Sequence, residues 1–277
     1  MDTKTAGRKL GLKEKYAHMT RGLGWDTTYQ PKEKVFPFEQ MEGIKIHDWD
    51  KWEDPFRLTM DAYWKYQAEK ERKLYAIIDA FAQNNGHLNV TDARYINVLK
   101  LFLTGISPPE YMAHRGFAHV GRQFSGVGPR VACQMQALDE LRHSQTQIHA
   151  ISNYNKHYNG MHDFRYMHDR VWYLSVPKSF FDDAASAGPF EFMVAIGFSF
   201  EYVLTNLLFV PFMSGAAYNG DMGTVTFGFS AQSDEARHMT LGLEVIKFIL
   251  EQDPANLPIV QKWIDKWSWR GIRVLTL

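Results

Sequence analysis

The chain is nearly devoid of cysteine, with Cys133 the single example among 277 residues. One cysteine excludes an internal disulfide and any zinc site built from several thiolates. It also favours a reducing compartment, and the first twenty residues contain no apolar segment of signal-peptide length. We therefore expect a cytoplasmic protein, in which Cys133 fills space in the core. A role for this thiolate as a metal ligand is the alternative.

The chain also lacks an excess of charge of either sign and has little uninterrupted hydrophobic sequence. Lys plus Arg and Asp plus Glu both number 31, so neither nucleic acid nor an anionic membrane is an expected partner. Residues 192–218 form an apolar run about long enough to span a bilayer. Glu201 interrupts this run, which favours a buried helix of a soluble protein without a membrane span.

The alternation typical of β-strands is nearly absent, and apolar residues recur at three- and four-residue spacing, so we expect an all-α fold. Residues 1–53 read as an irregular N-terminal arm, and residues 54–277 as one helical bundle domain. The first helix is expected to start after Asp54, and the adjacent Pro108 and Pro109 are expected to end another. Most helices exceed the mean of about 11–12 residues, which is typical of bundles with an internal site. The expected helices span 54–84, 92–105, 110–124, 129–154, 161–175, 189–213, 222–251 and 256–277.

Two related pentads, DELRH at 139–143 and DEARH at 234–238, are the most informative motifs. Each places a glutamate and a histidine three residues apart on one helical face, Glu140 with His143 and Glu235 with His238. A carboxylate and an imidazole so arranged can share a metal ion. A single such motif often arises by chance, but two that also share an aspartate and an arginine indicate a common function.

A dinuclear carboxylate site needs further oxygen donors from two other helices. Glu201 is a strong candidate, because an ionised carboxylate in an apolar run is costly unless it binds a partner or a metal. Glu110 is a second candidate, and His114 is a rival ligand near it. The four glutamates and two histidines would suit iron or manganese better than zinc.

The aspartates and arginines of the two pentads should point away from the metals. We expect them to contact one another and the ligand side chains. We expect Asp139 and Asp234 to accept the second N–H of a ligand histidine on the opposing helix. Arg142 and Arg237 are expected to pair with these aspartates.

Much longer stretches resemble one family, the bacterial multicomponent monooxygenases, and within it the large oxygenase subunits of phenol hydroxylases. The similar stretches cover nearly the whole chain and include GRQFSGVGPRVACQMQALDELRHSQTQ, FSFEYVLTNLLFVPFMSGAAYNGD and TFGFSAQSDEARHMTLGLEVIKF. The resemblance implies a ferritin-like di-iron carboxylate bundle with long helices. It also implies that the six Glu and His candidates bind two iron ions: Glu110, Glu140, His143, Glu201, Glu235 and His238.

The same resemblance implies activation of O2 as a co-substrate and hydroxylation of a small aromatic ring. Electrons would come from NADH through a separate reductase that carries the flavin and the iron–sulfur cluster. Further expected partners are smaller beta and gamma oxygenase subunits and a regulatory protein. Because these large subunits are roughly twice as long, we expect this chain to be their N-terminal half, truncated at the C-terminus.

Neighbours of the glutamates suggest a substrate pocket and a proton-transfer group. Ile106, Ala113, Phe200 and Phe209 are expected to line an apolar pocket beside the metals. The family resemblance suggests that Thr205 delivers protons, whereas core packing with its hydroxyl bonded back to the helix is the alternative. Asn206 and Gln232 are candidates for contacts around the ligands or for sensitivity to the regulatory protein.

Three other classes carry similar ligand spacing: the radical subunit of ribonucleotide reductase, acyl desaturases and iron-storage proteins. A radical subunit needs a tyrosine near the irons, typically one turn after the first ligand histidine, where this chain has Gln147. Tyr111 and Tyr202 adjoin ligands but should point away from the metals. An ion path to Glu201 would favour storage, and its apolar surroundings argue against one.

Overall fold

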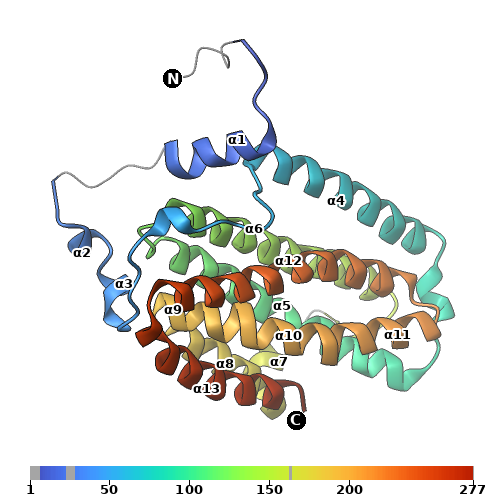
Figure 1. The fold of residues 1–277 in the computed structure, drawn as a ribbon. Helices are drawn as coiled ribbons and strands as arrows, with labels where there is room; N and C mark the ends of the chain where they lie inside the picture. Colours follow the sequence, from blue (N-terminus) through green and yellow to red (C-terminus); the bar gives the residue numbers. More distant parts are fainter. Residues whose placement is uncertain (1–6, 23–28, 162–163, 277) are drawn as a thin grey trace.

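The computed structural model describes residues 7–22, 29–161 and 164–276, and all regular structure in these ranges is helical (Figure 1). The prediction of an all-α bundle is therefore confirmed. The long helices are α4 (Met60–Gln83), α5 (Ala93–Gly121), α6 (Val127–Tyr154), α12 (Met222–Gln252) and α13 (Leu257–Thr276). Shorter ones are α1 (Leu12–Ala17), α2 (Lys32–Val35), α3 (Pro37–Met41), α7 (Phe164–Arg170) and α8 (Ser175–Ala185).

Between α8 and α12 the chain forms one composite helical segment, Pro189–Tyr218, in which α-helical and π-helical turns alternate. Its parts are α9 (Pro189–Phe192), the π-helix η6 (Met193–Phe200), α10 (Glu201–Leu204), the π-helix η7 (Thr205–Phe209) and α11 (Val210–Tyr218). Wide π turns are rare and frequently accompany functional sites. Here they flank Glu201 on both sides.

The composite segment is the one helix in the described part of the chain that is long and apolar enough to cross a membrane, with a mean hydropathy of 1.7. It packs instead against α12 and α13, and 61% of its most apolar window is buried inside the molecule. This burial agrees with the expected core helix.

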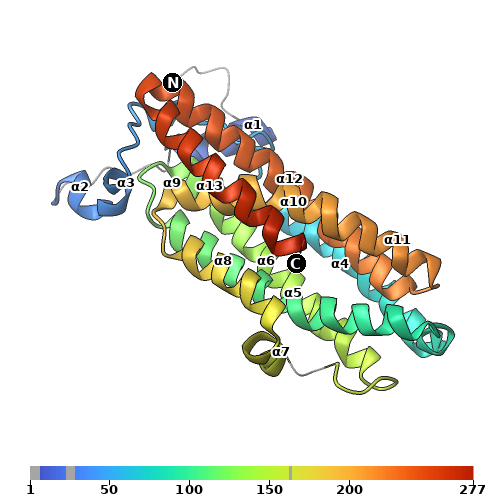
Figure 2. The ribbon, with the colours of Figure 1, turned by 90° about the horizontal axis from the view of Figure 1, so that it is seen from below.

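The long helices run side by side along the bundle, with α4 at one edge and α13 on the opposite side (Figures 1 and 2). The helices α5 and α6 form the most extensive pair, joined by the short turn at 122–126. Gly197 of η6 and Gly242 of α12 let two backbones touch, because a Cβ built on Gly242 would lie 1.9 Å from the Gly197 carbonyl oxygen. This close contact fixes the composite segment against the helix that carries the second pentad.

The expected break at Pro108 and Pro109 was wrong, because α5 continues through both prolines. A helical proline leaves the carbonyl four residues earlier without its N–H partner. For Pro109 that carbonyl belongs to Gly105, and it accepts a hydrogen bond from Nε2 of His168 at 3.2 Å. The structure thus replaces the missing donor from outside the helix, which no local pattern could indicate.

Other expected boundaries also differ. The first long helix begins at Met60, because the Asp54 side chain accepts hydrogen bonds from the Phe56 and Arg57 amides and closes a turn before it. The helix α8 was not expected at all. The N-terminal arm contains the short helices α1 to α3, and it is anchored where Trp49 packs against Phe190 and Phe248.

Candidate metal centre

Four helices bring the six candidate ligands together in the interior of the bundle. Glu110 lies on α5, Glu140 and His143 on α6, Glu201 on α10, and Glu235 and His238 on α12. They form two groups in which the ligand atoms lie within 4.8 Å of one another. One group contains Glu110, Glu140, His143 and Glu235, and the other contains Glu140, Glu201, Glu235 and His238. Glu140 and Glu235 belong to both groups, so their carboxylates can bridge two ions.

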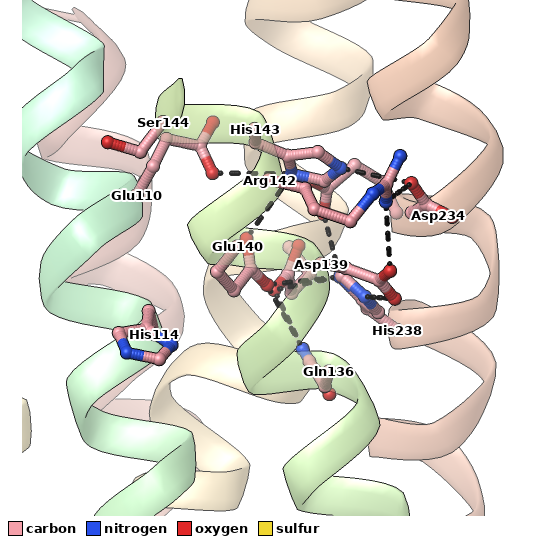
Figure 3. Close-up of polar contacts among 12 residues, drawn as sticks. Glu110, His114, Gln136, Asp139, Glu140, Arg142, His143, Ser144, Asp234 and His238 are labelled. Carbon is pink, nitrogen blue, oxygen red and sulfur yellow. Dashed lines mark hydrogen bonds and ion pairs between the residues drawn. The ribbon is translucent and has the colours of Figure 1, made fainter. Parts of the chain in front are cut away.

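Both imidazoles direct Nδ1 into this group of carboxylates (Figure 3). His143 Nδ1 lies 3.3 Å from Glu235 Oε1 and 3.4 Å from Glu140 Oε2. His238 Nδ1 lies 3.1 Å from Glu140 Oε1 and 3.3 Å from Glu235 Oε2. The two histidines therefore flank the two shared carboxylates.

The six side chains are buried, and none is more than 4% exposed. Burial raises the pKa of Glu110 to about 8, and burial together with the nearby Glu235 charge raises the pKa of Glu201 well above its usual range. Burial opposes a charged imidazole at 143, but the hydrogen bond to Asp234 and the nearby glutamate carboxylates outweigh it and raise the pKa of His143. Four carboxylates in a dry interior need positive charge or protons, because isolated buried anions are costly.

Several ligand atoms in this centre have no hydrogen-bond partner within the described part of the chain. They are His143 Nδ1, Glu201 Oε2 and Glu235 Oε1. Buried polar atoms are nearly always satisfied, so unpaired donors and acceptors gathered at one point indicate a missing partner. Imidazole nitrogens and carboxylate oxygens are donors that divalent iron and manganese accept. The residues present therefore fit a pair of such ions.

The aspartate of each pentad contacts the histidine of the other pentad. His143 Nε2 lies 3.1 Å from Asp234 Oδ2, and His238 Nε2 lies 3.3 Å from Asp139 Oδ2. A carboxylate can only accept, so each Nε2 carries a hydrogen, and Nδ1 is the ring atom that faces the centre. The geometry matches the contact that the sequence suggested across opposing helices.

The arginines of the pentads bind the same aspartates. Arg142 donates to Asp139 Oδ1 at 3.1 Å and to Asp234 Oδ2 at 3.3 Å, and Arg237 donates to Asp139 Oδ2. Arg142 also pairs with Glu71 of α4 at 2.8 Å. These contacts place positive charge beside both aspartates, and the pKa of Asp234 stays well below its usual range because hydrogen bonds from His143 and Lys70 outweigh burial.

Two buried amides contact the carboxylates and were not predicted. Gln136 donates to Glu201 Oε1 at 3.2 Å, and Gln147 donates to Glu110 Oε1 at 3.3 Å. Ser107 in turn donates to Gln147 Oε1 at 2.6 Å. The two glutamines lie on the inward face of α6 and Ser107 on that of α5, each one turn from a candidate ligand. This spacing could have been used to predict them from the sequence.

Helix α4 supplies a further set of contacts that sequence reasoning missed. Tyr63 and Gln67 both donate to Asp139 Oδ1 at 2.7 Å, and Lys70 binds Asp234. Polar residues at inward positions of an amphipathic helix are the pattern that could have revealed them. No sequence motif indicated that a fifth helix reaches the centre.

A narrow cavity lies against the carboxylates and has an almost wholly apolar wall. Ile106, Ala113 and Phe200 line it, as expected, together with Phe181 and Leu204. The fourth expected residue does not line it. Phe209 ends the π-helix η7 and is buried against Phe102, with ring centroids 5.9 Å apart. The wide turns of η7 change the helical register on which that expectation relied.

Thr205 is buried, and its hydroxyl has no hydrogen-bond partner. The alternative expectation, a hydroxyl bonded back to the helix, is not observed. Asn206 is exposed and donates to the Tyr202 carbonyl at 2.8 Å, so it contacts no ligand. Gln232 is partly buried, and among the described residues it makes no hydrogen bond to the centre.

The two rival ligands lie outside both ligand groups. His114 Nδ1 is 2.7 Å from the Ala137 carbonyl oxygen, and Figure 3 shows its ring apart from the carboxylates. Because a carbonyl oxygen only accepts, Nδ1 donates this hydrogen bond, which accounts for the polar contact of the ring. Cys133 is buried with its sulfur 3.8 Å from Met193 Sδ, as expected of a small core residue.

Comparison with known proteins reveals close relatives of this chain. A family model described as Methane/Phenol/Alkene Hydroxylase matches residues 25–253. The oxygenase component of phenol 2-monooxygenase from Pseudomonas sp. (strain CF600) is 76% identical over 270 residues, which cover 98% of this chain and 52% of that protein. The X-ray structure of xenon-pressurised phenol hydroxylase from Pseudomonas sp. OX1 has a TM-score of 0.91 and 77% identity, covering 97% of this chain and 54% of that one.

The fold extends to more distant proteins. Toluene 4-monooxygenase with toluene bound in its resting active site has a TM-score of 0.83 at 17% identity, covering 99% of this chain and 97% of that one. At this identity the similarity shows the fold alone. The chain spans about half the length of the curated relatives it matches first.

Proposed function

The chain belongs to the methane/phenol/alkene hydroxylase family, and we propose that it carries the di-iron centre of a phenol or related aromatic monooxygenase. In this role it is the ligand-bearing part of the oxygenase component. The observation that carries the proposal is the pair of buried ligand groups that share Glu140 and Glu235. Such sharing supports two ions held side by side.

The ligand chemistry favours iron over zinc. Four carboxylates and two imidazoles are hard or intermediate donors, whereas structural zinc sites prefer thiolates in a tetrahedral arrangement. When bound, the two irons would supply the activation of O2 and the oxidation of an aromatic ring. Glu110 and His143 would hold one iron, Glu201 and His238 the other, and the shared glutamates would bridge them.

The residues around the centre suit a water-sensitive oxidation. Ile106, Phe181 and Phe200 form the apolar wall and exclude water from the carboxylates. The same three residues also border a neighbouring cavity of about 230 Å³, lined further by Leu174 and Phe212. A cavity of this size and polarity accommodates a single aromatic ring, since an apolar cavity of about 150 Å³ can hold benzene.

Thr205 is the hydroxyl that we assign to proton transfer. It follows Glu201 by one turn, is buried, and has no protein partner for its Oγ. An unpaired hydroxyl can accept a proton from one group and donate to another without first breaking a hydrogen bond. This makes it suited to relay a proton within an apolar site.

The remaining roles follow from the family. We propose that NADH-derived electrons arrive through a separate reductase with flavin and iron–sulfur groups, and that beta and gamma subunits and a regulatory protein complete the enzyme. The exposed Asn206 is a candidate contact for the regulatory protein. A cytoplasmic location suits NADH as the electron source and the buried, unpaired Cys133.

The position one turn after His143 argues against a radical subunit. Gln147 occupies it, is fully buried and binds Glu110. Tyr111 and Tyr202, which adjoin candidate ligands, are 48% and 37% exposed.

The proposal is tested by metal analysis and turnover of the full-length oxygenase assembled with its partners. We expect about two irons per copy of this subunit and NADH-dependent hydroxylation of phenol. Glu201→Ala should abolish hydroxylation and leave the helix content unchanged. One metal per subunit, a tyrosyl radical signal, or normal turnover in Glu201→Ala would each contradict the assignment.

A further inference from the structure

One atom of the Gln67 side chain, on α4, contacts the aspartates of both pentads. Its Nε2 lies 2.7 Å from Asp139 Oδ1 and 2.9 Å from Asp234 Oδ1. These aspartates bind His238 and His143 through their other oxygens. One amide nitrogen is therefore two hydrogen bonds away from each of the two candidate ligand histidines.

The orientation of this amide follows from its surroundings. Both neighbours are carboxylates, which accept hydrogen bonds only, so the amide oxygen cannot face them. Nε2 offers two hydrogens, one for each aspartate. The Gln67 Oε1 on the other side is buried and has no hydrogen-bond partner.

An unpaired buried acceptor costs free energy, and an apolar side chain of similar size would avoid that cost. Stability alone therefore does not explain a glutamine at this position. The two donated hydrogen bonds are the feature that an apolar residue could not provide.

The charge around Gln67 is already balanced. Three cationic side chains form ion pairs with three carboxylates. The cations are Lys70, Arg142 and Arg237. The carboxylates are Glu71, Asp139 and Asp234. A neutral amide adds donors to the two aspartates without changing this balance, which neither a lysine nor a glutamate could do.

From these contacts we propose that Gln67 is a positioning residue that couples the two iron sites through Asp139 and Asp234. Each hydrogen bond from Gln67 draws electron density from an aspartate and weakens its pull on the histidine N–H. Without the amide, both aspartates accept more strongly from the imidazoles. Both imidazoles then become more electron-rich ligands, which stabilises ferric over ferrous iron.

The proposal rests on the proposed di-iron function, and it predicts an effect on the metals that packing alone would not produce. Gln67→Met keeps the length and removes both donors. In the full-length assembled oxygenase we expect its midpoint potential to fall and its affinity for ferrous iron to rise by up to about tenfold, because more electron-rich imidazoles bind the metal more tightly. Gln67→Asn keeps an amide too short to reach both aspartates and should give an intermediate shift in potential.

The control is Gln83→Met, the same substitution at an exposed position of α4. It should leave the potential and the affinity unchanged. If Gln67→Met does not assemble, Gln67→Asn still decides the question. A wild-type potential and affinity in an iron-loaded Gln67 variant would refute the coupling and leave the di-iron function standing, whereas wild-type enzyme without iron would refute the function itself.

Discussion

His143 of the first pentad is bound through Nε2 to Asp234 of the second pentad, 91 positions away in the sequence. The reciprocal contact joins His238 to Asp139. Each pentad therefore supplies a glutamate and a histidine to the centre, and an aspartate that orients the histidine of the other. This exchange explains why the five-residue motif occurs twice: neither copy is complete without its counterpart.

The crossed pairing predicts that loss of one aspartate weakens metal binding. In Asp234→Asn, the amide no longer offers His143 a charged acceptor, so the imidazole loses basicity and its fixed orientation. We expect iron affinity to fall by about 10- to 100-fold, measured by competition with a chelator in the assembled oxygenase. Asp265→Asn, at an exposed position of α13, is the control. Equal affinities in the two variants would show that the contact is incidental.

A second prediction concerns Glu201 without metal. Burial and the charge of Glu235 raise the pKa of Glu201 well above its usual range, so we expect the neutral form of this side chain to be favoured in the metal-free protein. Glu201→Gln resembles that protonated form. We expect the metal-free variant to have at least the wild-type melting temperature, while iron binding is lost. A large drop in the melting temperature of the metal-free variant would contradict this protonation state.

Substitutions of Thr205 can distinguish an effect on stability from an effect on catalysis. Its hydroxyl is buried without a partner, so Thr205→Val removes an unpaired polar group and keeps the shape. We expect an equal or higher melting temperature and an unchanged iron content, with slower hydroxylation. Thr205→Ser should retain more activity because it keeps the hydroxyl. Full activity in the valine variant would exclude a role in proton transfer.

The sequence predicted that the six candidate ligands lie together, because their signal is local. Glu140 and His143, like Glu235 and His238, show their shared face through i, i+3 spacing, and Glu201 is conspicuous as a charge in an apolar run. Those patterns require only that each segment be helical. All six side chains do lie together in the structure.

Contacts between distant segments were harder to foresee. The continuation of α5 through Pro109 depends on His168, which lies on another helix. The approach of Gln67 to the aspartates depends on where α4 packs, and the place of Phe209 depends on π turns that have no simple sequence pattern. Local periodicity thus indicated the candidate ligands, whereas tertiary packing determined which residues surround them.

The close contact of Gly197 and Gly242 gives a matched pair of substitutions. A Cβ at 242 would lie 1.9 Å from the Gly197 carbonyl oxygen, whereas a Cβ at 197 would meet its nearest atom at 3.7 Å. We expect Gly242→Ala to lower the free energy of unfolding by several kcal/mol, on the order of other overpacked core changes. Gly197→Ala should have a small effect. Similar melting temperatures for the two variants would show that the helices are further apart.

The last prediction concerns His87, which is buried and belongs to neither ligand group of the candidate metal centre. Its ring packs edge-on against Phe81 and Tyr154, and its Nδ1 has no hydrogen-bond partner. Burial lowers the pKa of His87 to about 4, below the value near 6.5 that is usual in an unfolded chain. Between these values the unfolded state binds more protons than the folded state, so the free energy of unfolding falls as the pH drops from about 6.5 to 4.

Replacing His87 should therefore flatten the dependence of stability on pH in that window. His87→Phe is close in size and cannot be protonated, so its melting temperature should fall less than that of the wild type between pH 6.5 and 4.5. The full contribution of the histidine is at most about 3 kcal/mol. His149→Phe, at a partly exposed position, controls for the loss of a histidine elsewhere. Because the carboxylates of the centre titrate alike in all three proteins, the difference between the curves isolates His87, and parallel curves for the wild type and His87→Phe would contradict the prediction.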